Sequence, residues 1–430
     1  MLIEPVTGFN GRLEFPGDKS ISHRLVLISL LLNGSLNIEN IGDGADVATS
    51  LQIVEQLGVK VDRRGNRVLL VNRQTVSGNG WPVQEINCGN SGTSVRLLAG
   101  ILAGFPGTYR LTGDESLSRR PMLRVSEPLA DMGADIACDL AGTLPMLIKG
   151  KSDLGPISFV NRHGSAQVKS AILLAGSLAN GETVVTEPLP SRDHSERLLA
   201  QLGAPITFKP GEVRISGPFK FSGHHAFCVP GDISSAAFFA VAAAIFPGSR
   251  VVLDNVLLNP SRTGFLEVLQ RMGASVVVEK QTHTWEPMGS VVIEGRELRP
   301  TRISPREIPG LVDEIPALAV AMAFAGGRST ISGAGELRYK ESDRLAHLAG
   351  QFRKAGIQCG ELPDGLIIEG NTIVPGGSEL DPAGDHRLAM AFTILGLRSQ
   401  RGSVIKNSEC VKISFHHFFD CCYSCIKSRI

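Results

Sequence analysis

The stretch PGDKS at residues 16–20 recurs as PGDIS at residues 230–234, an offset close to half of the 430-residue chain. Proline fixes φ and glycine permits a sharp bend, so both stretches suit a strand that crosses into a helix. The duplication predicts two domains joined by a hinge at these two turns. One domain comprises residues 17–230. The other is discontinuous and comprises residues 1–16 and 231–430.

Two short patterns alternate along the chain. An apolar helical stretch, then a glycine, then a strand-like stretch occurs five times, as in VEQLGVKV and LQRMGASV. Glycine suits the left-handed position that ends a helix. The second pattern is a glycine followed by a strand-like run, and its glycines are Gly34, Gly107, Gly181, Gly248, Gly327 and Gly402. The spacing predicts six repeated units of strands and helices, three in each domain, and therefore a layered α/β (α+β) fold.

The composition excludes several classes of protein. The chain is 43% hydrophobic and 20% charged with a net charge of +1, so no global field attracts nucleic acid or an anionic membrane. No apolar run reaches the roughly 18 residues of a membrane helix, and we expect AAFFAVAAAIF at residues 236–246 to form a buried core helix. The first motif begins at Pro16, which leaves no room for a signal peptide. We therefore expect a cytoplasmic protein that binds neither nucleic acid nor a membrane.

The C-terminal stretch departs from the repeat. After Gly402 a closing strand is due near residue 427, but the chain reads FFDCCYSCIKSRI and stops, so this strand is expected to be missing. The cysteines of this stretch lie near His416 and His417, which leaves a zinc site as an alternative. Their spacing fits no common zinc pattern, so we expect no metal and no cofactor. These cysteines are Cys410, Cys421, Cys422 and Cys425.

The motif PGDKSISHR predicts an anion site at the start of a helix. Asp18 or Ser20 can cap the helix. Lys19 and His23 are four residues apart, as are Ser20 and Arg24, so each pair shares a helix face. A helix N-terminus that carries Lys, Ser and Arg in its first turns favours anions.

Three further motifs carry polar residues at the starts of apolar helices or in the turns before them. NCGNSGTSVRLLAG is glycine-rich, which lets backbone N–H groups approach a phosphate or a carboxylate. SLSRRPM presents paired arginines, which suit bidentate binding of the same groups. SAQVKSAILLAG has a polar start that can hold a hydroxylated ligand, and SRDHSER adds one more arginine. The candidates are Asn90, Gly92, Arg120, Ser165, Ala166, Gln167 and Arg192.

The second half of the chain adds carboxylates to these cations. LVDEIPALAVAMAFAGG puts Asp313 at the mouth of an apolar helix. A helix cap is one interpretation, and a general base is the other, because apolar surroundings raise the pKa of a carboxyl group. Carboxylates among many cations predict small substrates with at least two anionic groups. The candidates in LRYKESDRLAHL and DHRLAMAF are Lys340, Glu341, Arg344, His386 and Arg387.

Taken in order, PGDKSISHR, GNSGTSVR, RRPM, SAQVKSA, RYKESDR and DHRLAM resemble the 5-enolpyruvylshikimate-3-phosphate synthase family, over residues 1 to about 415. The resemblance implies a two-domain inside-out α/β barrel of six βαβαββ units. It implies transfer of the enolpyruvyl group of phosphoenolpyruvate to the 5-hydroxyl of shikimate 3-phosphate, with release of phosphate, in the shikimate pathway to chorismate and the aromatic amino acids. The expected partners are these two small molecules, and we expect a monomer.

The resemblance also assigns roles to residues. Those implied to bind shikimate 3-phosphate are Lys19, Ser20, Arg24, Ser165, Ala166, Gln167, Arg192, Asp313 and Lys340. Those implied to bind phosphoenolpyruvate are Lys19, Asn90, Gly92, Arg120, Gln167, Arg344, Arg387 and Lys412. Asp313 resembles the proton acceptor, and Glu341 resembles the group that serves the methylene carbon. The expected catalytic set is Lys19, Asp313, Glu341 and His386.

One departure, one further likeness and two alternatives accompany the resemblance. The family usually has proline after SF near the C-terminus, where this chain reads SFHHFF. Gly92 resembles the glyphosate-sensitive members, so we predict sensitivity to glyphosate. One alternative, the UDP-N-acetylglucosamine enolpyruvyl transferase family, has Lys-Asn where this chain has Lys19-Ser20, and a loop cysteine where this chain reads TGDESLSRRP. The other is a non-catalytic clamp that only binds anions, against which the joint presence of Lys19, Asp313, Glu341 and Arg387 argues.

Overall fold

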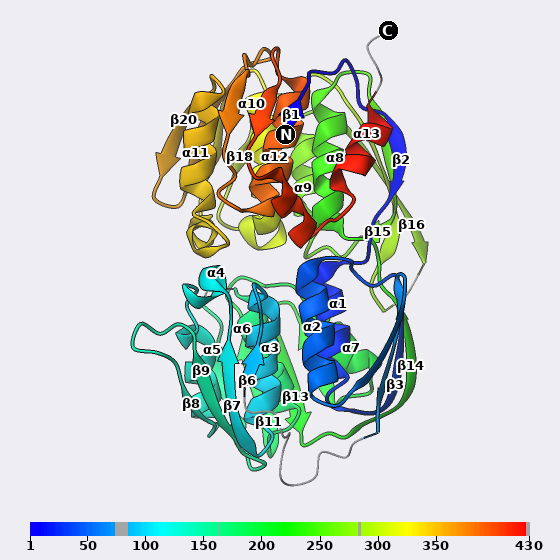
Figure 1. Ribbon diagram of the computed structural model, residues 1–430, viewed down its shortest axis with the longest axis vertical. Coiled ribbons are helices and arrows are strands. Elements are labelled where there is room, and N and C mark those ends of the chain that lie inside the picture. Colours follow the sequence, from blue (N-terminus) through cyan, green and yellow to red (C-terminus); the bar gives the residue numbers. More distant parts are fainter. Residues whose placement is uncertain (74–84, 163, 283–284, 427–430) are drawn as a thin grey trace. The chain divides into compact units, whose positions relative to one another are not determined.

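The computed structural model of this chain describes residues 1–73, 85–162, 164–282 and 285–426 (Figure 1). The chain folds into two compact units. Unit 1 comprises Met1–Pro16 and Pro230–Ile430, and unit 2 comprises Gly17–Val229.

The described part of unit 2 holds three four-stranded sheets, ordered β14-β3-β5-β4, β6-β7-β9-β8 and β10-β11-β13-β12. In each, the first two strands are parallel and the other pairs are antiparallel. The strands are β3 (Leu32–Glu39), β4 (Lys60–Arg64), β5 (Arg67–Asn72), β6 (Glu85–Asn87), β7 (Gly107–Thr112), β8 (Asp135–Ala137), β9 (Met146–Gly150), β10 (Ser158–Val160), β11 (Gly181–Thr186), β12 (Ile206–Lys209), β13 (Glu212–Gly217) and β14 (Phe221–Cys228). The helices are α1 (Lys19–Ile28), α2 (Ala45–Gln56), α3 (Gly92–Ala103), α4 (Glu115–Ser118), α5 (Leu123–Asp131), α6 (Ala166–Gly176) and α7 (His194–Gln201).

Unit 1 has the same plan, and its described sheets are ordered β16-β17-β15-β2, β18-β19-β21-β20 and β1-β23-β22. The strands are β1 (Leu2–Ile3), β2 (Gly11–Glu14), β15 (Arg250–Leu257), β16 (Ser275–Thr282), β17 (Met288–Glu294), β18 (Arg302–Ile303), β19 (Gly327–Ile331), β20 (Gln358–Leu362), β21 (Gly365–Gly370), β22 (Ser378–Leu380) and β23 (Ser403–Ile405). The helices are α8 (Ile233–Ile245), η1 (Ile308–Gly310), η2 (Val312–Glu314), α10 (Ile315–Ala323), α9 (Gly264–Arg271), η3 (Gly335–Tyr339), α11 (Arg344–Lys354), α12 (His386–Arg398), η4 (Ser408–Ile413) and α13 (Phe418–Cys425).

The helices form the core of each unit and the sheets cover them (Figure 1). In unit 1, every residue of α8 and α10 is buried, and these two helices pack against each other and against α12. A helix that is apolar all round must be enclosed, so the strands take the outside. The predicted buried helix at residues 236–246 is confirmed over residues 236–245 of α8, and Phe246 is the buried C-cap residue. The predicted α/β class with six repeated units is likewise confirmed.

The glycines predicted to end helices have the backbone that this position needs. Their φ angles lie between 82° and 110°, in the left-handed region where a side chain is strained. They follow α2, α5, α7, α9 and α11, as the repeat predicts. These residues are Gly58, Gly133, Gly203, Gly273 and Gly356.

The two PGD stretches are the points at which the chain passes between the units. Strand β2 pairs with β15 in unit 1 and leads into α1 of unit 2, whereas β14 pairs with β3 in unit 2 and leads into α8 of unit 1. Asp18 and Asp232 cap these helices, because their Oδ1 atoms accept hydrogen bonds from backbone N–H groups at 2.9 and 2.8 Å. A Cβ atom at Gly17 would lie 1.8 Å from the carbonyl oxygen of Asn40, so this turn requires glycine.

The sixth sheet is completed by the N-terminus of the chain. Strands β22 and β23 form the parallel pair of this sheet, and β1 pairs antiparallel with β23. In the other five sheets a later strand of the same repeat takes the position that β1 takes here. After β23 the described chain forms η4 and α13, and it shows a single bridge between Phe9 and Ile426 rather than a strand. Residue 427, near which the closing strand was due, lies outside the described residues.

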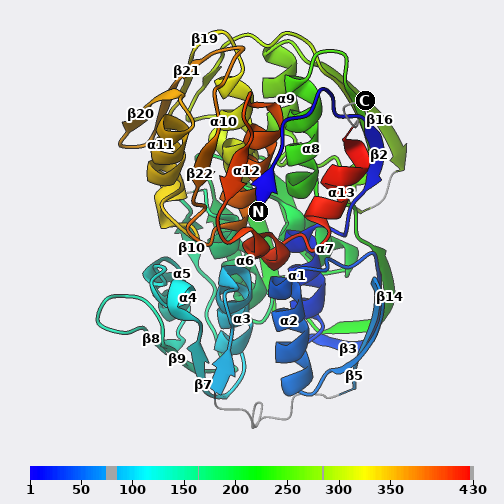
Figure 2. The ribbon, with the colours of Figure 1, turned by 45° about the horizontal axis from the view of Figure 1, so that its top comes forward.

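Aromatic side chains fix the C-terminal stretch to unit 1. The ring centroids of Phe415 and Phe418 lie 6.0 and 5.6 Å from that of Phe239 in α8, and Phe415 lies 5.9 Å from Phe15. All four rings are buried. Both views place α13 beside β2 (Figures 1 and 2). Phe415 and Phe418 therefore anchor the described part of this stretch in the hydrophobic core.

Candidate functional site

The candidate residues of unit 2 lie at the starts of its core helices. Lys19 and Ser20 open α1, Gly92 opens α3 and Ala166 opens α6. Ser165 caps α6 through its side chain. The first N–H groups of a helix have no partner within the helix and favour anions. Unit 2 therefore offers three such helix starts.

Hydrogen bonds tie the starts of α3 and α6 together. The Oε1 atom of Gln167 accepts a hydrogen bond from Nη1 of Arg96 at 2.6 Å. Its Nε2 atom donates to Oγ1 of Thr93 at 2.9 Å. Both ends of the Gln167 amide are thus oriented by α3, so this side chain has a fixed direction.

Two arginines approach the first residue of α3. The Nη2 atom of Arg120 donates to Oδ1 of Asn90 at 2.7 Å. A Cβ atom at Gly92 would lie 3.0 Å from Nη1 of Arg96 and 3.1 Å from Nη1 of Arg120. Arg96 and Arg120 are 4% and 8% exposed. The absence of a side chain at Gly92 leaves the helix start open to a ligand beside both guanidinium groups.

Arg24 joins three elements of unit 2. Its Nε and Nη2 atoms donate to Oγ of Ser195 and Oγ of Ser170, each at 2.8 Å, and its Nη1 atom donates to the carbonyl oxygen of Ser20, also at 2.8 Å. These partners belong to α7, α6 and α1 respectively. Arg192, in the turn just before α7, is half-buried. The predicted shikimate 3-phosphate residues of unit 2 thus come from these three helices and the turns before them.

Lys19 and His23 share a helix but have different surroundings. The Lys19 Nζ atom lies 3.1 Å from Oδ2 of Asp46, and its side chain is 19% exposed. His23 is fully buried, with Nδ1 2.7 Å from Oγ of Ser50. Burial lowers the pKa of His23 to about 4, with smaller effects of the neighbouring charges. His23 is therefore neutral near pH 7 and adds no positive charge to the start of α1.

The candidate residues of unit 1 surround one buried arginine. Arg344 is 1% exposed, and its Nε and Nη2 atoms donate to Oδ2 of Asp385 at 2.7 Å and to Oε2 of Glu341 at 2.6 Å. Its Nη1 atom lies 3.6 Å from Oδ1 of Asp313, which also lies 3.7 Å from Nζ of Lys340. Burial by itself would lower the pKa of Arg344, but the carboxylates, Asp385 foremost, raise it above its ordinary value. A permanent cation thus stands beside two candidate acid–base groups.

The same cluster connects the starts of two core helices. Asp313 lies in η2, directly before α10. Its carbonyl oxygen accepts a hydrogen bond from Nη1 of Arg387 at 3.0 Å. His386 and Arg387 are the first residues of α12 and are 1% and 7% exposed. Unit 1 therefore brings Asp313, Lys340, Glu341, Arg344 and Arg387 together.

Lys412 is not bonded to this cluster, although η4, to which it belongs, packs against α12. Its side chain is 50% exposed, and its ion pair is with Glu409 in the same turn. Among the described residues, no hydrogen bond or ion pair joins Lys412 to Arg344 or its partners.

Two residues that orient the candidates are absent from the predicted site. Asp46 pairs with Lys19 and opens α2, and Asp385 pairs with Arg344 and caps α12. Asp385 is the first letter of the quoted DHRLAMAF motif, and an Asp just before an apolar helix is a cap signal. Asp46 likewise precedes an apolar run. The sequence marks both positions but does not indicate which cation each one faces.

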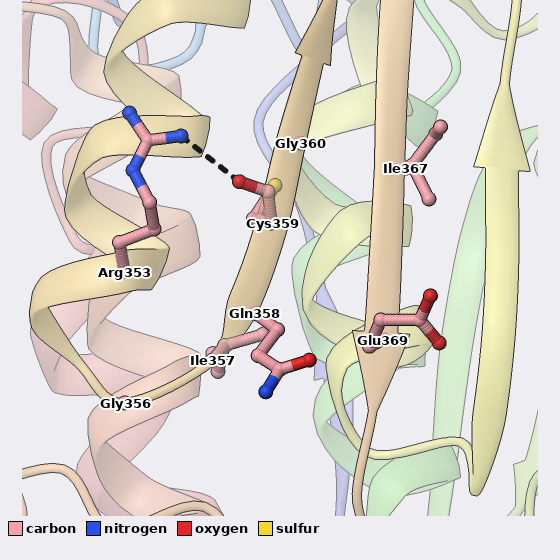
Figure 3. Close-up of a pocket in the computed structure, with 8 residues that line it drawn as sticks. All are labelled: Arg353, Gly356, Ile357, Gln358, Cys359, Gly360, Ile367 and Glu369. Atoms are coloured by element: carbon pink, nitrogen blue, oxygen red, sulfur yellow. Dashed lines mark hydrogen bonds between the residues drawn. The ribbon is translucent and has the colours of Figure 1, made fainter.

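An open cavity of about 600 Å³ lies elsewhere in unit 1, beside α11, β20 and β21 (Figure 3). Arg353, Cys359, Ile367 and Glu369 are among its lining residues, and Arg353 donates to the carbonyl oxygen of Cys359 at 2.9 Å. It lies at the last turn of α11, whereas Arg344 is the first residue of that helix. None of the candidate site residues lines it, so it is not part of the candidate site.

The described residues give no support to two other classes of site. No group of three or more His, Cys, Asp or Glu side chains among them is placed to hold a metal ion, the described C-terminal cysteines included. Within the same residues, every helix is too short or too polar to span a bilayer.

Comparisons with known proteins agree with the motifs. Residues 3–421 match the family EPSP synthase (3-phosphoshikimate 1-carboxyvinyltransferase). The 3-phosphoshikimate 1-carboxyvinyltransferase of Desulforamulus reducens is 44% identical over 422 residues, which are 98% of this chain and 98% of that protein. That of Xanthomonas euvesicatoria pv. vesicatoria is 45% identical over 413 residues, 96% of this chain and 93% of the relative.

Solved structures support the same relationship. EPSP synthase from Acinetobacter baumannii superposes with a TM-score of 0.85 at 38% identity, covering 99% of this chain and 97% of that one. The enolpyruvyl transferase NikO from Streptomyces tendae shares the fold at 17% identity, with a TM-score of 0.78 over 98% of this chain and 96% of that one. With its motifs in order and a match that spans almost its whole length, this chain belongs to the EPSP synthase (3-phosphoshikimate 1-carboxyvinyltransferase) family.

Proposed function

We propose that this chain transfers the enolpyruvyl group of phosphoenolpyruvate to the 5-hydroxyl of shikimate 3-phosphate and releases phosphate, as an enzyme of the shikimate pathway. The observation that carries the proposal is the pair of carboxylates, Asp313 and Glu341, beside the buried Arg344 in a chain of this family. The reaction needs a base, an acid and fixed cations, and this cluster holds all three kinds of group.

The chemistry assigns one proton to each carboxylate. Glu341 protonates the methylene carbon of phosphoenolpyruvate, which becomes a methyl group, and the adjacent carbon gains cationic character. The 5-hydroxyl oxygen bonds to that carbon while Asp313 accepts the hydroxyl proton. The carbon–oxygen bond to phosphate then breaks, and Glu341 takes a proton back from the methyl group to restore the double bond. An acid and a base at one centre require different environments.

The cations stabilise the charge that develops on phosphate and carboxylate. We propose that Arg344 and Arg387 in unit 1, and Lys19 and Arg120 in unit 2, hold phosphoenolpyruvate. The remaining candidates for this substrate are Asn90, Gly92, Gln167 and Lys412, the last of which is half-exposed and paired with Glu409. His386 stays a proposed member of the catalytic set.

Shikimate 3-phosphate is proposed to bind mainly to unit 2. Its phosphate suits the start of α6 and the guanidinium group of Arg192, because helix N-termini and arginines are the common phosphate ligands in proteins. Its hydroxyl groups suit serine and amide side chains. The proposed residues are Lys19, Ser20, Arg24, Ser165, Ala166, Gln167 and Arg192, with Asp313 and Lys340 from unit 1.

We also propose that the two units act as domains, residues 17–230 and residues 1–16 plus 231–430, and that the PGD turns are their hinge. The route of the chain supports this, because a strand of each unit continues into a helix of the other at these turns. Closure over both substrates would keep water from the activated intermediate. We propose a cytoplasmic monomer.

Phosphate release tests the proposal. Purified protein is mixed with phosphoenolpyruvate and either shikimate 3-phosphate or UDP-N-acetylglucosamine. We expect release only with shikimate 3-phosphate. Release only with UDP-N-acetylglucosamine would establish the activity of the UDP-N-acetylglucosamine enolpyruvyl transferase family instead. If folded protein releases no phosphate with either acceptor, the non-catalytic anion-binding clamp is the function that remains.

Variants of the carboxylates test the assigned roles. Asp313→Asn and Glu341→Gln keep the side-chain size but remove the acid–base function, so kcat should fall by about 10²–10⁴-fold. The matched control is Glu369→Gln, a half-exposed carboxylate of unit 1 paired with Arg328. Unchanged turnover in Asp313→Asn would refute its role as the proton acceptor.

A further inference from the structure

A buried charge cluster lies next to two segments proposed to bind shikimate 3-phosphate. It consists of Lys169 in α6, Glu187 directly after β11, and Glu196 in the first turn of α7. The Lys169 Nζ atom lies 2.8 Å from Oε2 of Glu187 and 2.6 Å from Oε1 of Glu196, and all three side chains are at most 3% exposed. Apolar replacements for buried ion clusters are often neutral or favourable for stability. Stability alone is therefore a weak explanation for these charges.

One arm of the cluster holds the turn before Arg192. Glu187 accepts two hydrogen bonds from Ser191, one from its backbone N–H at 3.1 Å and one from its Oγ at 2.6 Å. Lys169 Nζ also donates to the carbonyl oxygen of Ser191 at 3.4 Å. Because Ser191 is bonded directly to Arg192, these contacts fix the backbone from which the arginine extends.

The other arm holds the turn that opens α6. Asn161, directly after β10, donates from Nδ2 to Oε1 of Glu187 at 2.7 Å. The same amide donates to the carbonyl oxygen of Ser165 at 3.1 Å and accepts from its backbone N–H at 3.2 Å. Glu187 therefore connects the Ser165 turn and the Ser191 turn through hydrogen bonds of ordinary length.

We propose that Lys169 is a positioning residue that acts through Glu187 to fix the Ser165 turn and Arg192 for shikimate 3-phosphate. The inference rests on the proposed function, in which both segments bind that substrate. The side chain of Gln167, which is proposed to contact both substrates, is oriented by Arg96 and Thr93 of α3 rather than by this network, and Arg120 donates to Asn90. The network therefore supports segments proposed to contact shikimate 3-phosphate more directly than those proposed to contact phosphoenolpyruvate.

The electrostatics explain why Lys169 has to be a cation. Burial would lower its pKa, but Glu196 and Glu187 raise it above its ordinary value. Burial raises the pKa of Glu196, although Lys169 opposes this. Without the ammonium group, Glu187 and Glu196 would face each other in a medium of low dielectric and repel each other. Glu187 would then shift, and both turns that it holds would shift with it.

The test is Lys169→Met, with shikimate 3-phosphate binding measured by calorimetry and KM measured for both substrates. We expect binding of shikimate 3-phosphate about tenfold weaker, which corresponds to the loss of about one hydrogen bond to a charged group. The KM for phosphoenolpyruvate should stay within about twofold. Hydrogen exchange should accelerate at the backbone amides of Ser191 and Ser165. Ile172→Ala, in the buried face of α6, is the control that lowers stability without changing shikimate 3-phosphate affinity.

A double-mutant cycle with Arg192→Ala separates positioning from a general loss of structure. If Lys169 acts through Arg192, the effect of Lys169→Met on shikimate 3-phosphate affinity shrinks in the Arg192→Ala background. Unchanged affinity in folded Lys169→Met, or a fully additive cycle, overturns the inference. If Lys169→Met does not fold, Ser191→Ala and Asn161→Ala test the two arms with the same criterion. Failure of the unaltered protein to bind shikimate 3-phosphate overturns the proposed function instead.

Discussion

His23→Asn should make the stability of this protein less sensitive to acid. His23 is enclosed between α1, α2 and α3, where its Nδ1 atom lies 2.7 Å from Oγ of Ser50 and its ring is fully buried. Its pKa is lowered from 6.5 to about 4, first by burial and to a lesser extent by Lys19 and Arg24, while Asp46 and Asp18 oppose the shift. Asparagine can keep a hydrogen bond to Ser50 and cannot titrate.

The magnitude follows from the difference between the folded and unfolded pKa values. Between pH 6.5 and pH 4 the unfolded chain binds a proton that the folded chain does not, so stability falls as the pH falls through this range. The loss from His23 is about 2 kcal/mol between pH 7 and pH 5, and about 3 kcal/mol by pH 4. The contribution is fully present above the unfolded pKa. Asparagine is smaller than histidine, so the substitution also lowers the free energy of unfolding by the same amount at every pH. This constant loss cancels when the free energies at two pH values are compared.

Urea unfolding at several pH values, for the original protein and His23→Asn, measures the effect. Because the chain has two compact units, hydrogen exchange at the amides of α1 is measured alongside to report on unit 2 alone. The free-energy difference between the two proteins should shrink by about 2 kcal/mol from pH 7 to pH 5. His224→Asn changes an exposed imidazole in the same unit and should alter stability by less than about 0.5 kcal/mol.

A difference between the two proteins that stays constant from pH 7 to pH 4 would refute the reasoning. It would mean that the His23 ring is solvated or paired in the folded protein, and that α1 does not pack on α2 and α3 as described. A shift of the opposite sign, with His23→Asn losing more stability in acid, would mean that His23 is a cation held by Asp46.

Three further changes test the candidate site and the C-terminal stretch. Gly92→Ala should raise KM for phosphoenolpyruvate and weaken inhibition by glyphosate, because the new Cβ atom would lie only 3.0 and 3.1 Å from the guanidinium groups of Arg96 and Arg120. The control is Gly350→Ala, because a Cβ atom at Gly350 would have no neighbour within 4 Å. Phe418→Ala should lower the free energy of unfolding by about 3–5 kcal/mol in urea titrations, whereas Tyr423→Ala on the exposed face of the same helix should change it little. Lys412→Met should raise KM for phosphoenolpyruvate if this lysine binds it, and an unchanged KM would remove it from the site.

The parts of the fold that follow from local rules could be predicted from the sequence. The helix-ending glycines, the Asp18 cap and the buried α8 depend on a few neighbouring residues, and the structure confirms each of them. The C-terminal helix could also have been found, since Phe418, Cys422 and Cys425 have the helical spacing of one buried face. The repeat by itself indicates only that its closing strand is missing, whereas the local spacing also indicates the helix that takes its place before residue 427.

The partners of the charged residues could not be predicted in the same way. Spacing within one helix shows that Lys19 and His23 lie on neighbouring positions, but not that Asp46 meets the first and Ser50 the second. Lys169 reads from the sequence as one polar residue in an apolar helix. Its two glutamates come from later elements, and only the packing of α6 against β11 and α7 brings the three charges together.

The two PGD copies differ in use because they open different helices. In the first copy Lys19 is partly exposed at the start of α1, and a cation there can meet an anionic substrate. In the second copy Ile233 is buried, and Ser234 donates from Oγ to Oε1 of Glu314 and accepts from Arg262 at 2.6 Å. Glu314 directly follows Asp313, so this serine secures the turn that carries the proposed base. The same turn is therefore used in two ways: it places a cation at the start of α1 in the first copy, and it supports the turn that carries the proposed base in the second.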